Sequence, residues 1–193
     1  MISSNFSGNI GNSVIQYLIA RIVADKNSYS WGFNSRFNYD YHGGLNQLDF
    51  MDLDYGVAHT ATYHEMPPGI TKIWEESHET FNYPNGDSLD WYKYQPDVFD
   101  IKDNTKLIIH CCQDARYFDP YKEKIKSWLK IRPLDAGYYR NILNTANIVL
   151  DKDMCIVNCR GGEYISIPHV LLPKKYYENA MNIMRKRNPN MRF

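Results

Sequence analysis

A short apolar run that ends in an arginine and two glycines constrains the fold of this chain most strongly. Residues 155–164 read Cys-Ile-Val-Asn-Cys-Arg-Gly-Gly-Glu-Tyr. The run over residues 154–158 predicts a buried strand, and the carboxyl end of a strand in an α/β protein opens onto the ligand crevice. A guanidinium at that place suits bidentate binding of a phosphate. Two interpretations stay open: Arg160 binds a phosphorylated ligand, or it pairs with Glu163 and orders the loop.

The charge balance argues against two classes of partner. Lysine and arginine number 22, as do aspartate and glutamate, so the formal net charge is zero. A neutral chain gives no support for a general nucleic-acid binder or a protein that binds anionic membranes. No apolar run approaches the length of a bilayer span, and the first residues lack the basic region of a signal peptide. We therefore expect a cytoplasmic protein of one core or two small lobes.

The cysteines argue against a structural zinc site. The chain has four, and none of them forms a C-x-x-C pair: Cys111, Cys112, Cys155 and Cys159. Zinc sites usually draw on closely spaced pairs of this kind. We expect buried free thiols in a reducing compartment, and no bound zinc.

A glycine- and asparagine-rich loop is predicted to precede the first helix. Residues 5–12 read Asn-Phe-Ser-Gly-Asn-Ile-Gly-Asn, and apolar residues then recur at helical spacing, at positions 15, 18, 19 and 22. A loop that leads into a helix N-terminus presents free backbone N–H groups to an anion or a sugar hydroxyl. Gly8 and Gly11 serve either such a ligand or a tight turn, and Asn12 serves as a ligand, a helix cap or both.

The rest of the chain predicts alternating strands and helices, hence an α/β fold. Residues 28–100 favour long loops with a short strand near residues 70–74. The other predicted elements are strands at residues 106–110, 154–158 and 191–193, and helices at residues 119–129, 136–149 and 172–187. The last two strands and the helix between them would form a β-loop-α-β unit around the arginine turn.

Four segments, in order, resemble the α-1,2-fucosyltransferases of glycosyltransferase family 11. Residues 8–21 resemble a G-x-x-G-N-Q loop followed by an F-Q-Y-A-x-A-R helix, and residues 113–118 resemble a Q-S-x-x-Y-F segment. Residues 158–164 are similar to the donor motif H-x-R-R-G-D-Y, and residues 171–177 to a leucine followed by Y-Y. In the donor motif the first arginine is kept as Arg160, whereas Asn158, Gly161 and Glu163 replace its histidine, second arginine and aspartate.

This resemblance implies two facing Rossmann-like lobes of GT-B type. Residues 1–150 would form an acceptor-side lobe, and residues 151–193 the start of a nucleotide-sugar-binding lobe that is truncated here. The implied reaction is metal-independent transfer of fucose from GDP-fucose to a galactose-containing glycan, with inversion, by a hexosyltransferase. Arg160 and Glu163 would be catalytic. The donor-binding residues would be Gly8, Gly11, Asn12, Asn158, Arg160, Gly162 and Tyr164.

Other functions stay open at this point. The altered motif is compatible with a non-catalytic module that binds a glycan or a protein, and with a nucleotide-sugar enzyme of another class. The acceptor hydroxyl needs a base, and Glu163, His42 and Asp40 are all candidates.

Two further patterns favour structural roles. Asp52-Leu53-Asp54 has the spelling of a D-x-D metal pair, but such an acidic stretch more often forms a solvated turn. Lone histidines such as His59, His64 and His110 are more often packed or surface residues than catalysts.

Overall fold

The computed structural model describes residues 1–4, 6, 10–33, 48, 50–59, 61, 64–82, 84, 86, 88–159 and 171–193. The chain divides into two compact units, Met1–Asp135 and Ala136–Phe193. The lobe boundary predicted at residue 150 stays a prediction.

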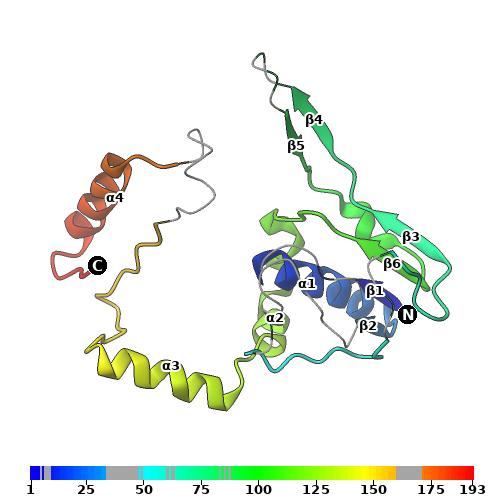
Figure 1. Cartoon of the computed structure of the whole chain (residues 1–193), viewed down its shortest axis with the longest axis horizontal. Helices are drawn as coiled ribbons and strands as arrows, with labels where there is room; N and C mark the ends of the chain where they lie inside the picture. Colours follow the sequence, from blue (N-terminus) through cyan, green and yellow to red (C-terminus); the bar gives the residue numbers. More distant parts are fainter. Residues whose placement is uncertain are drawn as a thin grey trace. The chain divides into compact units, whose positions relative to one another are not determined.

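A four-stranded parallel sheet forms the centre of the first unit (Figure 1). Its strands, in spatial order, are β2 (Trp31–Phe33), β1 (Ile2–Ser4), β6 (Thr105–Ile108) and β3 (Lys72–Glu75). The predicted strands at residues 106–110 and 70–74 are therefore confirmed to within one or two residues. A parallel sheet next to a helix also confirms the predicted α/β class.

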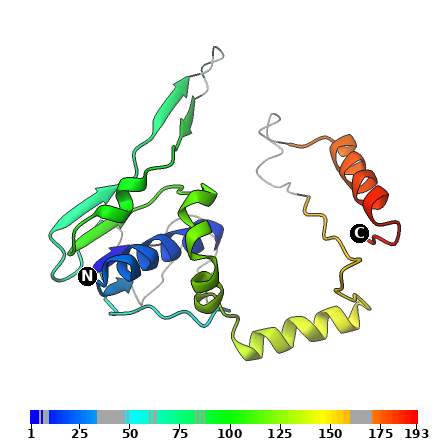
Figure 2. The same ribbon diagram turned by 180° about the vertical axis from the view of Figure 1, so that it is seen from behind.

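Helix α1 (Ile10–Asn27) packs on one face of this sheet (Figure 2). Its residues Leu18, Ile19 and Ile22 are buried as their spacing predicts, whereas Ile15 is only half-buried. Burying each such side chain contributes roughly 1.5–3 kcal/mol. The helix begins at Ile10, so the prediction of a loop through residue 12 is wrong: Gly11 and Asn12 lie in the first helical turn.

The opposite face of the sheet carries polar side chains. Because successive side chains of a strand point to opposite faces, Ser3 and Lys106 lie on the face away from α1, and they are aligned in register. Ser3 Oγ lies 2.9 Å from His59 Nε2, and Lys106 Nζ donates to the Glu65 carbonyl at 2.6 Å. Burial lowers the pKa of His59 and that of Lys106. His59 is thus a packed histidine, as predicted.

A two-stranded antiparallel hairpin was missed by the sequence analysis. Strands β4 (Glu79–Asn82) and β5 (Ser88–Trp91) pair side by side (Figure 1). All four β4 side chains are exposed, so neither face of the strand needs apolar residues. The sequence of β4 therefore lacks the alternation of apolar and polar residues by which a half-buried strand is recognised. The turn signals at residues 83–87 do fall between the two strands.

Short helical turns connect the hairpin and β6 to helix α2 (Lys122–Trp128). The described chain between β5 and α2 forms the 3₁₀ turns η2 (Pro96–Asp100), η3 (Ala115–Tyr117) and η4 (Asp119–Tyr121). Ile125 and Trp128 of α2 pack half-buried against the core. The helix predicted at residues 119–129 thus begins as the 3₁₀ turn η4 and continues as α2.

The second unit contains most of α3 (Pro133–Thr145) and all of α4 (Lys174–Arg187). The half-buried side of α4 consists of Tyr177, Ala180, Met181 and Met184, which recur at helical spacing. Met154 and Arg192 form one parallel bridge, in which Cys155 N donates to the Arg192 carbonyl at 2.8 Å. The pairing expected between residues 154–158 and 191–193 is thus present, but as a bridge instead of two strands.

No helix in the described part of the chain is both long and apolar enough to cross a membrane. All four cysteines are free, but only Cys112 is buried, so the expectation of buried thiols holds for that residue alone.

Candidate functional site at the carboxyl edge of the sheet

The carboxyl ends of the parallel strands bring together two of the segments that carry the family resemblance. Helix α1 begins beyond the end of β1, and the loop at residues 109–114 follows β6, the neighbour of β1. Gln113 Nε2 lies 3.4 Å from Asn12 Oδ1 across this edge. A second contact lies deeper, where Gln16 Nε2 donates to the Ile109 carbonyl at 2.9 Å. Both contacts join the first turns of α1 to the loop after β6.

Among the described residues, none lies close to the position that a side chain at Gly11 would occupy. A Cβ added at Gly11 would meet no atom within 4 Å outside its immediate surroundings in the chain. The packing of the described residues therefore does not require glycine at this position. Close approach of a ligand to the first turn of the helix would require it.

The Glu76 carboxylate holds the loop after β6 in place through hydrogen bonds. This side chain directly follows β3 and is only 1% exposed. Its Oε2 accepts hydrogen bonds from His110 N at 2.9 Å and Cys111 N at 2.6 Å, and its Oε1 accepts one from Cys112 N at 2.8 Å. Three successive N–H groups that converge on one carboxylate form an anion-binding nest. The protein fills this nest with its own side chain, so the nest itself is closed to a ligand.

The backbone of the loop is bent at Cys112. Its φ of 43° lies in the left-handed region, which costs a side-chain-bearing residue free energy. The hydrogen bonds to Glu76 compensate for that cost. Burial raises the pKa of the Cys112 thiol, and the nearby Glu76 carboxylate raises it further. Cys112 is therefore an unreactive structural thiol.

The rim of the edge is polar and aromatic. His110 Nε2 lies 3.1 Å from Glu75 Oε1, and its ring lies 5.9 Å, between centroids, from that of Tyr92. Tyr92 in turn lies 5.5 Å from the ring of His78. His110 is thus a partly exposed surface histidine, in line with its predicted role.

Most of the predicted donor site lies outside the described residues. This holds for Gly8, for the turn from Arg160 to Tyr164, and for the candidate bases Asp40 and His42. Asn158 is described and is exposed. The proposed contact of Arg160 with a phosphate therefore stays a prediction. Among the residues that the structure does describe, no group of His, Cys, Asp or Glu side chains is arranged to hold a metal ion.

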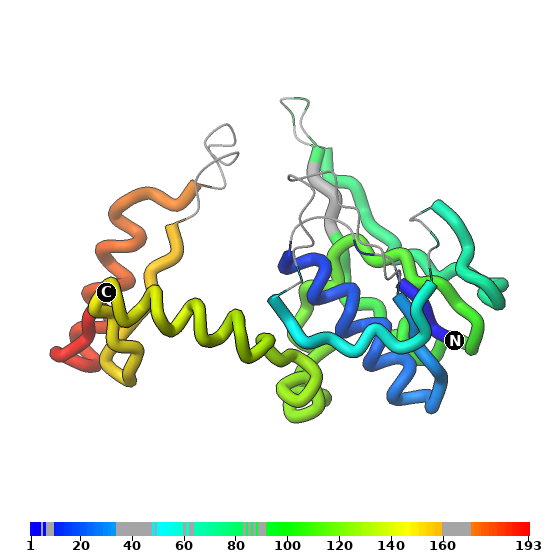
Figure 3. Tube along the Cα trace, turned by 60° about the horizontal axis from the view of Figure 1, so that its bottom comes forward, coloured from blue at the N-terminus to red at the C-terminus, as the bar shows by residue number. Residues whose placement is uncertain are grey.

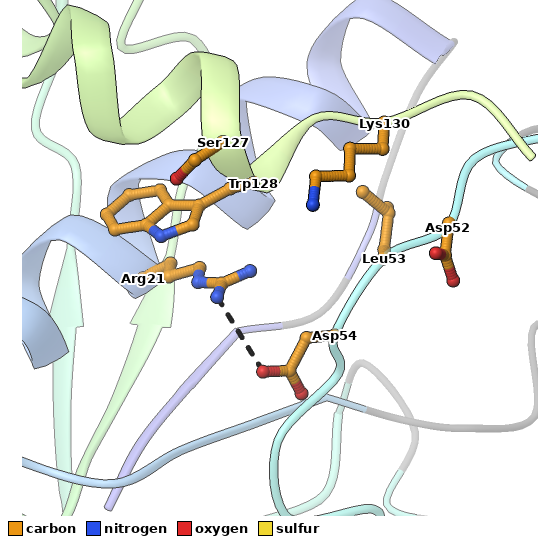
Figure 4. Close-up of a pocket in the computed structure, with 7 residues that line it drawn as sticks. All are labelled: Arg21, Asp52, Leu53, Asp54, Ser127, Trp128 and Lys130. Carbon is orange, nitrogen blue, oxygen red and sulfur yellow. Dashed lines mark ion pairs between the residues drawn. The ribbon is translucent and has the colours of Figure 1, made fainter.

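A second polar site lies against the flank of α1 and was missed by the sequence analysis. A pocket of about 270 Å³ is lined by Arg21, Asp52, Leu53, Asp54, Ser127, Trp128 and Lys130 (Figure 4). The segment around residues 50–59 runs beside α1 (Figure 3). It also pairs with the chain after α2, through Asp52 N to the Lys130 carbonyl at 2.7 Å and Arg132 N to the Phe50 carbonyl at 2.9 Å. The D-x-D pattern thus contributes to a pocket, where the sequence favoured a solvated turn.

Two signals for this pocket were present in the sequence. Arg21 is the arginine that ends the pattern resembling the first helix of the family, and Asp52 and Asp54 form the D-x-D spelling. Neither signal indicates that these segments meet, because 31 or more residues separate them and α2 lies farther still along the chain. Only the pairing after α2 brings Trp128 and Lys130 to the same place.

Comparison with known proteins found no match. No family model, no curated protein and no solved structure is significantly similar to this chain. The resemblance to glycosyltransferase family 11 therefore rests on the four sequence segments alone.

Proposed function

We propose that this chain belongs to a nucleotide-sugar-dependent glycosyltransferase of GT-B type that transfers fucose from GDP-fucose to a galactose-containing glycan, with inversion. The four ordered segments support this proposal. The observation that carries it in the structure is the contact between Asn12 and Gln113. Residues from two of the four segments lie together at the sheet edge where α/β proteins bind ligands.

The reaction needs a site that stabilises a departing diphosphate. The acceptor hydroxyl oxygen would attack the anomeric carbon, the bond from that carbon to the β-phosphate oxygen would break, and GDP would leave. Arg160 would hold the growing negative charge with charge-assisted hydrogen bonds. Glu163 would take the proton of the acceptor hydroxyl. In this scheme the positive charge of Arg160 performs the stabilisation that a metal ion provides in metal-dependent transferases.

The first turn of α1 would contribute neutral hydrogen bonds to donor binding. Its N–H groups, which have no acceptor within the helix, and the Asn12 amide can hydrogen-bond to a phosphate or a sugar hydroxyl. The contact with Gln113 holds the Asn12 side chain at the edge of the sheet. Asn12→Ala should therefore weaken donor binding less than loss of Arg160, since it removes a neutral hydrogen bond instead of a charge-assisted one.

The decisive experiment measures donor hydrolysis and transfer with GDP-fucose and lactose as acceptor. Wild type, Arg160→Ala and the control Arg140→Ala would be compared, because Arg140 is an exposed arginine of α3. Removing a donor from a site of this kind typically lowers the rate by about 100–1000-fold. Equal turnover of wild type and Arg160→Ala would remove the arginine from the mechanism.

Calorimetry with GDP separates this function from binding without catalysis. GDP binding that is lost in Arg160→Ala and kept in Arg140→Ala would support the transferase. Binding of lactose with no effect of GDP or GDP-fucose would instead support a non-catalytic glycan-binding module.

A further inference from the structure

The pocket beside α1 combines groups that are fully engaged with groups that are not. The Arg21 guanidinium lies 4.6 Å from the centre of the Trp128 ring and 5.0 Å from that of Trp31. It also donates to the Tyr17 hydroxyl. These contacts hold Arg21, whose side chain is only 13% exposed, in one orientation at the back of the pocket. The pocket is therefore built around a fixed cation.

The charges at the mouth of the pocket are less engaged. Asp54 Oδ2 lies 3.6 Å from Arg21 Nη2, which is an ion pair but longer than a hydrogen bond. Asp54 Oδ1 accepts one hydrogen bond, from Gly56 N at 3.0 Å. Asp52 and Lys130 are exposed, and neither side chain is hydrogen-bonded or ion-paired to any residue that the structure describes. Figure 4 shows the Lys130 ammonium directed toward the space above Arg21. Donors and acceptors thus surround the same small volume.

The balance of charges indicates the class of ligand. Arg21 and Lys130 supply two positive charges, and Asp52 and Asp54 supply two negative ones, so the lining is neutral overall. A phosphate would meet two carboxylates, and a metal cation would meet two basic groups; either contact is unfavourable at short range. A neutral ligand with many hydroxyl groups meets no such repulsion, because each hydroxyl both donates and accepts.

We propose that this pocket is a saccharide-binding site. The carboxylates of Asp52 and Asp54 would accept hydrogen bonds from sugar hydroxyls, and Lys130 would donate to them. The exposed part of the Trp128 indole would pack against the apolar C–H groups of the ring. A volume of about 270 Å³ equals that of about nine water molecules, which suits one sugar unit.

The site is distinct from the proposed donor site. Arg21 follows Asn12 by nine residues on α1, which is about 14 Å along the helix axis. A sugar in the pocket would therefore be an anchoring unit of a longer glycan, away from the atoms that react. Binding of a sugar in this pocket does not depend on Arg160. An experiment can therefore contradict the saccharide site without contradicting the transferase function, and can contradict the transferase function without contradicting the saccharide site.

Titration of the full chain with lactose, followed by tryptophan fluorescence and by saturation-transfer NMR, tests the proposal. Galactose, fucose and inorganic phosphate would be titrated in the same way. The variants are Asp52→Ala and Lys130→Met, with Lys126→Met as the matched control, because Lys126 is an exposed lysine of α2 that pairs with Glu123. We expect millimolar saccharide binding that weakens at least tenfold in both pocket variants and less than twofold in the control.

Three results would overturn the proposal. One is the absence of saccharide binding in a wild-type protein that is folded by circular dichroism. Another is saccharide binding that neither pocket variant changes, which would place the sugar elsewhere. The third is inorganic phosphate that binds the pocket in preference to the sugars. The pocket variants alter exposed side chains, so their unfolding temperatures should match that of the wild type and confirm intact folding.

Discussion

Glu76 and Arg21 are both charged side chains enclosed in the first unit, and their surroundings differ. Every contact of the Glu76 carboxylate described above is a hydrogen bond from a backbone N–H group of one short loop. Arg21 is held by aromatic rings and a tyrosine hydroxyl, and its carboxylate partner Asp54 is largely exposed. The Glu76 carboxylate has its hydrogen-bond donors within the fold. Arg21, in contrast, lines an open pocket.

This difference separates a structural role from a binding role. A buried charge whose hydrogen bonds are complete has no capacity left for a ligand, and its loss leaves the partner groups unpaired. A fixed charge next to unpaired polar side chains can still gain interactions when a ligand enters. We therefore assign Glu76 to the architecture of the carboxyl edge and Arg21 to the wall of a binding pocket.

The largest effect is expected for Glu76→Ala. This change leaves three backbone N–H groups without their acceptor and removes the compensation for the bent backbone at Cys112, so unfolding should become easier by about 3–5 kcal/mol. Urea denaturation would measure it. The control is Glu75→Ala, because Glu75 is exposed and pairs only with His110 among the contacts identified here; its effect should stay below about 1 kcal/mol. Equal losses in the two variants would contradict the structural role of Glu76.

A smaller effect is expected for Arg21→Met, which keeps the apolar stem and removes the guanidinium. The loss of two indole contacts and the bond to Tyr17 should cost about 1–3 kcal/mol. Asp54 can be solvated in the variant because it is already exposed. The same denaturation experiment on Arg116→Met provides the control, since Arg116 stacks on Tyr94 at an exposed site. A loss for Arg21→Met as large as that for Glu76→Ala would erase the contrast between the two regions.

The smallest effect is the pH dependence contributed by His59. Burial lowers the pKa of this imidazole below its ordinary value of 6.5. As the pH falls below about 6.5, the unfolded chain binds a proton before the folded protein does, so the free energy of unfolding decreases. The decrease continues until the pH reaches the folded-state pKa, with a slope of at most about 1.4 kcal/mol per pH unit.

Thermal unfolding at pH 7.0 and pH 5.5 measures this contribution. The variant His59→Gln keeps a polar side chain next to Ser3 but cannot be protonated, so its unfolding temperature should vary less between the two pH values. An unchanged pH dependence in His59→Gln would show that other groups produce the acid sensitivity.

The first helix and the hairpin show which elements the sequence could predict and which it could not. Helix α1 was predicted because its apolar residues repeat with the period of a helix, and that period is a local property. Strand β4 was missed because all its side chains are exposed, and no periodicity then distinguishes it from a loop.

The sequence by itself determined helix α1, the strands β3 and β6, the α/β class, and the pairing of the segments that flank α4. Only the tertiary structure decided that Glu76 fills the nest after β6, and that Arg21, Asp54 and Trp128 enclose one pocket. The physical reason is that helix and strand periodicity depends on neighbours in the chain, whereas these contacts join residues more than 30 positions apart. Such contacts depend on how the elements pack, and no local pattern encodes them.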